Sequence, residues 1–150
     1  MIQTLINDTS GLILQNKIYL NLADKMTNTD YKPLITFTSQ LTGNSKTFVP
    51  ASANYTYKDR FVQLLIYSQQ VAANENLLTG SIYLGDTDFP LGFYDAVIYQ
   101  NTSNTNLDPS GLTVIWNGLM NVTSNSTTNP VQYTEYTTND SDTESVYITI

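Results

Sequence analysis

Apolar residues at every second position are the feature that most constrains the fold of this chain. Ile18, Leu20 and Leu22 alternate with polar residues, and Ile35 and Phe37 repeat the pattern further along. Successive side chains of a β-strand point to opposite faces, whereas a helix repeats its apolar residues every three or four positions. The period of two therefore predicts a chain of β-strands, each with one buried face.

Turn residues separate these strands. Thr42-Gly43-Asn44-Ser45 predicts a tight hairpin turn before a returning strand over 46–49, and Asp108-Pro109-Ser110-Gly111 predicts a type I turn. The run 60–67 is the most apolar in the chain and predicts a strand buried on both faces. Short strands joined by turns, without an internal repeat, predict an all-β sandwich.

A local motif indicates the type of sandwich. Leu91-Gly92-Phe93-Tyr94 opens a strand and resembles the tyrosine corner of Greek-key sandwiches, in which a tyrosine hydroxyl bonds back to the backbone. The alternative is an ordinary strand with a glycine at its start. In a tyrosine corner the inward residues would be Tyr94, Ala96 and Ile98, and the outward ones Phe93, Asp95, Val97 and Tyr99. We expect an Ig-like or Greek-key β-sandwich with extended N- and C-terminal segments.

The patterning divides the chain into three parts. Residues 31–122 are the best patterned and are expected to form the β-sandwich core, and residues 1–30 an N-terminal strand or arm. Residues 123–130 have low complexity, so 123–150 is expected to form a linker and C-terminal strands or an arm. Either end could pair within its own domain or with a sheet edge of a neighbouring subunit.

The last well-patterned strand contains Asn117-Gly118. This dipeptide predicts either a two-residue hairpin or a β-bulge within one long strand. If it is a bulge, we expect Val114 and Trp116 to face the core.

The chain contains no His and no Cys. This excludes disulfides, thiolate nucleophiles and any Ser–His–Asp mechanism within one chain. Carboxylates are the remaining catalytic groups, and Asp86, Asp88 and Asp95 lie close together in sequence. Two carboxylates that face each other across a sugar could hydrolyse a glycoside, but the sequence alone does not place them so.

Calcium is the metal that carboxylate and carbonyl oxygens favour. The candidate ligands are Asp86 with Asp88, and the alternating Asp140, Asp142 and Glu144. The first pair lacks the third ligand and the glycine of an EF-hand, and the alternative at both places is a solvated acidic loop. We expect no metal and no other cofactor.

The formal net charge is -7, and all six Lys and Arg residues lie in the first 60 positions. We expect no nucleic-acid partner, because a protein that binds phosphates needs clustered cations. No apolar run approaches the length of a membrane span, so we expect no membrane partner. The uneven charge indicates either a variable solvated surface or two faces of opposite sign, which would suit head-to-tail packing of identical subunits.

The chain has more aromatic residues than one small core needs. Tyrosine is favoured at interfaces because it buries a large area and keeps a polar tip. The alternative for each is an ordinary core or cross-strand contact. The aromatic interface candidates are Tyr55, Tyr57, Phe89, Phe93, Tyr99, Tyr133 and Tyr136. The alternating Val146, Ile148 and Ile150 predict a terminal strand that could also pair with a neighbour.

Three stretches carry a resemblance to a family. Residues 57–61, 91–99 and 118–122 resemble small virion structural proteins of tailed bacteriophages, particularly marine and crAss-like types. The resemblance covers about 31–122 and carries no functional residue across. It implies a non-enzymatic structural protein of the virion, a capsid decoration (cement) protein or a neck or tail component. Its expected partners are capsid or neck and tail subunits and further copies of itself.

Two other functions stay open from the sequence. A carbohydrate-binding sandwich would use Tyr55, Tyr57 or Tyr99 as platforms that stack on sugars. An enzyme would have to depend on carboxylates alone, such as Asp86 and Asp88.

Overall fold

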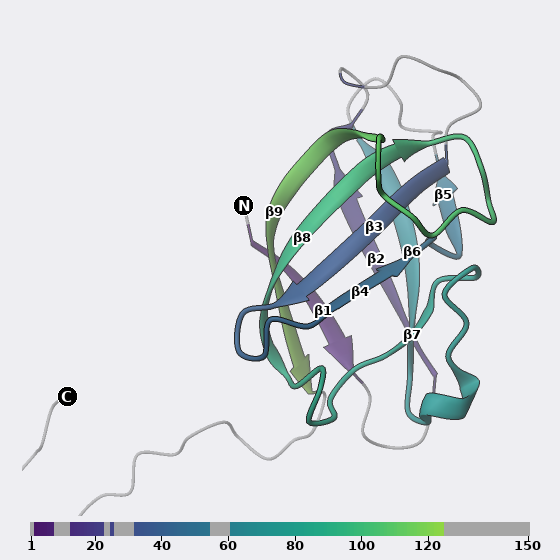
Figure 1. Cartoon of the computed structure of the whole chain (residues 1–150). Coiled ribbons are helices and arrows are strands. Elements are labelled where there is room, and N and C mark those ends of the chain that lie inside the picture. The colour runs from purple at the N-terminus through teal and green to yellow at the C-terminus, as the bar shows by residue number, and fades with distance from the viewer. Residues whose placement is uncertain (1, 8–12, 23–24, 26–31, 55–60, 125–150) are drawn as a thin grey trace, which may run out of the picture.

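Two β-sheets pack face to face and enclose one apolar core (Figure 1). The structure, a computed structural model, describes residues 2–7, 13–22, 25, 32–54 and 61–124. Within these ranges nearly all regular structure is β-strand, which confirms the predicted all-β sandwich.

The larger sheet has five strands in the order β1-β9-β8-β3-β4. They are β1 (Ile2–Asn7), β3 (Lys32–Ser39), β4 (Ser45–Phe48), β8 (Gly92–Asn101) and β9 (Thr113–Ser124). Neighbouring strands are antiparallel except β1, which runs parallel to β9. The first described strand therefore lies beside the last one at one edge of the sheet.

The smaller sheet is built around β6. Its strands are β2 (Leu14–Leu20), β5 (Ser52–Asn54), β6 (Val62–Gln69) and β7 (Ser81–Tyr83). β2 and β5 flank β6 in antiparallel pairing, and β7 runs parallel to it. A short 3₁₀ turn, η2 (Ala72–Asn74), precedes β7. In the part of the chain that is described, no helix has the length and apolarity needed to cross a membrane.

The predicted hairpin is present between β3 and β4. Thr38 pairs with Ser45 across the turn, and the amide of Gly43 donates to the carbonyl of Ser39 at 2.8 Å. Gly43 has a φ of 77°, a left-handed conformation that glycine adopts without steric cost. This glycine is the sequence signal that located the turn.

Tyr94 forms the predicted corner at the start of β8. It is fully buried, and its hydroxyl donates to the carbonyl of Pro90 at 2.5 Å. The pKa of Tyr94 is raised to about 12, chiefly because burial disfavours the charged form. The hydrogen bond with Ser39 lowers the pKa by a smaller amount, and the negative charge of Asp86 raises it further. The inward and outward faces of β8 are those predicted, because Ala96 and Ile98 are also buried.

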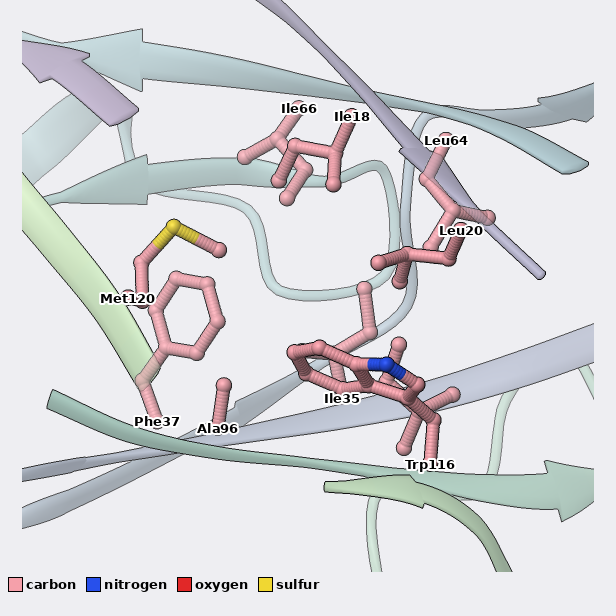
Figure 2. Close-up of a pocket in the computed structure, with 10 residues that line it drawn as sticks. Ile18, Leu20, Ile35, Phe37, Leu64, Ile66, Ala96, Trp116 and Met120 are labelled. Carbon is pink, nitrogen blue, oxygen red and sulfur yellow. The ribbon is translucent and has the colours of Figure 1, made fainter. Parts of the chain in front are cut away.

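The core joins side chains from both sheets, and Figure 2 shows its centre. A cavity of about 10 Å³ lies there between Ile18 and Leu64 of the smaller sheet and Phe37 and Met120 of the larger one. Its surface is apolar, so a water molecule would find no hydrogen-bond partner in it. The cavity is therefore a packing gap of the core and not a ligand site.

The sandwich extends beyond residues 31–122. β1 and β2 lie within the first 30 residues, and β2 contributes the buried Ile18 and Leu20 to the core. The alternation of these residues with polar ones fits them to a sheet with one covered face. At the other end β9 continues to Ser124.

β9 passes through Asn117-Gly118 without turning, so the hairpin interpretation is wrong. A register shift puts Trp116 opposite Ile98 but Val114 opposite Tyr99, which makes Ile115 the extra residue of a bulge. Ile115 is buried, and Val114 is 48 % exposed. The expectation that Val114 faces the core is therefore wrong, because the bulge reverses the alternation before Trp116. Trp116 does pack against the core, as predicted.

Candidate functional site

The outer face of β8 carries two of the predicted interface residues. Phe93 is 46 % exposed and Tyr99 is half-buried. They lie on the same face of the strand, about 20 Å apart at the usual rise of a strand. Val97 lies between them on that face and is half-buried as well. The structure therefore places both residues on one surface of the larger sheet.

β9 extends this surface sideways. Val114 lies opposite Tyr99, and Leu119 lies opposite Asp95. We name these neighbouring residues the apolar strip. Its members are Phe93, Val97, Tyr99, Val114 and Leu119. The alternation of β8 indicated its part of the strip, but Val114 was missed because the bulge at Ile115 reverses the pattern.

Polar side chains border the apolar strip and pair with one another. The hydroxyls of Thr36 and Thr47 lie 2.9 Å apart across β3 and β4. Gln40 donates through Nε2 to Oδ1 of Asp95 at 2.8 Å. The charge of Asp95, which lies among the strip residues, is therefore already hydrogen-bonded. These four polar side chains are therefore already paired with one another.

The other predicted residues divide into two groups. Phe89 is partly buried against the core and so does not stand out as a free aromatic surface. Tyr99 lies between Leu34 and Val114 in the pairing, with only part of its side chain open to a sugar or a partner. The remaining candidates lie outside the described residues. They are Tyr55, Tyr57, Tyr133, Tyr136, Val146, Ile148 and Ile150.

The carboxylate of Asp86 organises a turn. Its Oδ1 accepts the amide of Phe89 at 2.6 Å and that of Asp88 at 3.1 Å. This turn leads directly into Pro90 and the tyrosine corner. The described residues contain no group of three or more His, Cys, Asp or Glu side chains that could hold a metal ion. The second calcium candidate, at Asp140, Asp142 and Glu144, lies outside them.

A partly buried ion pair joins β4 of the larger sheet to Glu75, which directly follows η2, and no local pattern in the sequence predicted it. Nζ of Lys46 lies 2.5 Å from Oε2 of Glu75 and donates to the carbonyl of Tyr83 at 2.7 Å. The same Glu75 oxygen accepts the amide of Tyr83 at 2.7 Å. The ammonium also lies 4.3 Å from the ring centre of Phe89, a cation–π distance. Lys46 shares its face with Phe48, and that spacing is the signal that could have found it.

An open groove of about 370 Å³ lies at the end of the sandwich where β3 begins. Its lining comes from β3, from β5 and the connection that precedes it, and from two loops. The residues are Lys32, Pro33, Val49, Pro50, Ala51, Ser52, Ala53, Leu78 and Asn104. Lys32 is exposed, and no hydrogen bond or ion pair joins its side chain to another described residue. No local pattern predicts this groove, because its walls are far apart in the chain.

The described surface therefore offers two places for a partner, the apolar strip and the groove. Comparison of the chain with protein-family models, with curated proteins and with solved structures finds no match.

Proposed function

We propose that this chain is a non-enzymatic structural subunit of a bacteriophage particle. It would serve in the virion as a capsid decoration (cement) protein or as a neck or tail component. The resemblance of residues 57–61, 91–99 and 118–122 supports the class of protein. The observation that carries the role is the apolar strip on the outer face of β8 and β9.

A scattered exposed apolar residue is normal, but neighbouring ones indicate a contact surface. Phe93 and Val114 are each nearly half exposed, and the register of β8 and β9 connects them through Val97, Tyr99 and Leu119. Interfaces between subunits favour aromatic residues and few charges at their centre. The strip has this composition, and we assign it to contacts with neighbouring subunits, first of all further copies of this chain.

We also propose that the sandwich is Ig-like. In variable-type Ig domains a G-F-C-C′ sheet packs on a B-E-D sheet. The orders β9-β8-β3-β4 and β2-β6-β5 support this correspondence. The corner at Tyr94 supports it as well, since such a tyrosine lies near the start of the F strand.

The mass of the full chain in solution tests the role. Size-exclusion chromatography with light scattering should show a trimer or a larger species. Phe93→Ser and Val114→Ser should lower that mass, whereas Val71→Ser should not. Val71 is a matched control because it is 53 % exposed but lies beside η2, away from the strip. A strict monomer that is retarded in a glycan-affinity gel would overturn the proposal in favour of carbohydrate binding.

A further inference from the structure

We infer that the C-terminal segment 139–150 of one copy binds the groove beside Lys32 of the next copy. Copies would then join head to tail. This inference rests on the proposed structural role and names a partner for it, a second copy of this chain. It uses the groove and not the apolar strip, so the two surfaces can be tested separately.

The groove and the start of the C-terminal segment lie at opposite ends of the sandwich. Lys32 pairs with Asn101 at the end of β8, and Thr113 at the start of β9 pairs with the neighbouring Gln100. β9 then runs the length of the sheet to Ser124. At the usual rise of a strand, its 12 residues span roughly 35 Å. A segment that begins after Ser124 therefore starts next to the groove of a second copy, if that copy is stacked with its groove end on the Ser124 end of the first.

The charges at the two ends are complementary. The end that Ser124 reaches carries Asp86, Asp88 and Asp95. The groove end carries Lys25 and Lys32, with Asp108 as the described acidic residue nearby. The ammonium of Lys46 does not offset the first end, because Glu75 neutralises it. Head-to-tail stacking brings the acidic end of one copy to the basic end of the next. The charges therefore favour this orientation over one in which two like ends meet.

The chemistry of the segment matches that of the groove. Residues 125–150 contain four acidic residues and no basic one. Asp140, Asp142 and Glu144 precede an alternating apolar end at Val146, Ile148 and Ile150. The groove offers the ammonium of Lys32, which has no partner among the described residues, next to the apolar side chains of Val49, Leu78 and Ala53. One segment can therefore place a carboxylate on Lys32 and an apolar side chain on the wall.

Chain length favours a neighbouring copy over the same copy. The 21 residues 125–145 would have an average end-to-end distance of about 25 Å as a flexible chain, and about 70 Å when fully extended. To reach the groove of its own copy, the segment would have to span at least the length of β9, roughly 35 Å, which exceeds this average end-to-end distance. An end-to-end neighbour presents its groove close to Ser124, where the effective concentration of the segment is higher.

Zero-length cross-linking of the full chain tests the inference directly. Light and ¹⁵N-labelled copies are mixed, and a carbodiimide joins carboxylates to amines that lie in contact. We expect peptide pairs that join Lys32 to Asp140, Asp142 or Glu144, with light–heavy pairs among them. Pairs within one copy only would overturn the inference, because the segment would then bind its own groove. Pairs that join the segment to Lys17 or Lys25 but not to Lys32 would overturn the assignment of the groove.

Charge reversal provides the second measurement. Lys32→Glu should weaken self-association roughly tenfold in sedimentation at low salt. Lys17→Glu is the matched control, since Lys17 is exposed on β2 but lies outside the groove. Adding Asp140→Lys and Asp142→Lys to Lys32→Glu should restore association. Equal effects of the two lysine variants, or no rescue, would contradict the inference.

Failure of this inference differs from failure of the structural role. If the segment forms no cross-link to Lys32 but Phe93→Ser still lowers the mass, the role stands and the head-to-tail contact is wrong. If the chain is a strict monomer under all conditions, both are wrong.

Discussion

The indole of Trp116 lies directly over Gly118 of the same strand. A β-carbon at residue 118 would lie 2.5 Å from two carbon atoms of the ring, far inside van der Waals contact. Ala96, opposite Gly118 on β8, is also small. Because both residues are small, there is room for the indole, which lies with Ala96 among the side chains around the centre of the core (Figure 2).

Gly118→Ala is therefore expected to destabilise the fold. The indole would have to move within a packed core, and such overpacking costs about 1–3 kcal/mol. Urea unfolding followed by Trp116 fluorescence measures the change. Asn117→Ala, at an exposed position of the same strand, is the control and should change stability little. Equal stability of Gly118→Ala and the unmodified chain would contradict the described position of the ring.

Removing the hydroxyl of Tyr94 is expected to weaken the corner. Tyr94→Phe keeps the buried ring but leaves the carbonyl of Pro90 without this donor. The expected loss is about 1–2 kcal/mol in the free energy of unfolding. Tyr99→Phe is the control, because it removes a hydroxyl from the half-buried outer face of the same strand. If both variants unfold at the same urea concentration, the corner does not contribute to stability.

Tyr94 should also make stability depend on pH in the alkaline range. Its pKa is raised to about 12, against about 10 for a tyrosine in an unfolded chain. Between these values the unfolded chain loses the proton and the native chain keeps it, so stability falls as pH rises. The contribution is complete below pH 10 and is lost as pH rises through 12, by roughly 2 to 3 kcal/mol. The stability advantage of the unmodified chain over Tyr94→Phe should shrink and then be lost as pH rises through this window, and an advantage that does not change with pH would refute the assignment.

The alternation of β8 shows how far sequence reasoning reaches. Tyr94, Ala96 and Ile98 were placed inward correctly, because one strand with one covered face obeys a local rule. The run that became β6 was predicted to be buried on both faces. Its inner face is buried, but Leu65 and Tyr67 on the outer face are only half-buried. The sheet has solvent on that side, and hydrophobicity alone does not report it.

The features that depend on pairing and packing between distant segments could not be predicted from the sequence. The bulge at Ile115 results from the pairing of β9 with β8. The dipeptide Asn117-Gly118 predicted a bulge two residues later in the chain. The turn predicted at 108–111 lies one residue further along the chain, since its hydrogen bond joins the amide of Leu112 to the carbonyl of Pro109. The groove at Lys32 combines segments that meet only when both sheets have formed. Neither the local period nor turn chemistry contains that information.

The Lys46–Glu75 ion pair should contribute to stability as a unit. Glu75→Ala leaves the nearly buried ammonium with the carbonyl of Tyr83 but without its counter-charge. We expect a loss of about 2–4 kcal/mol, below the upper range for buried pairs because part of the Glu75 side chain is exposed. A double-mutant cycle with Lys46→Met measures the coupling energy, and additive effects of the two substitutions would show that the pair is not coupled.

Lys46 also has a consequence for how copies of this chain can meet. It points inward from β4, the outermost strand of the larger sheet on that side. Natural sheets use an inward charge on such a strand to prevent uncontrolled pairing with other chains, and Pro50 follows soon after without an amide to donate. Fibre-like growth of one continuous sheet through this strand is thereby disfavoured. At this edge of the larger sheet, contacts between side chains are thereby favoured over the addition of a further strand.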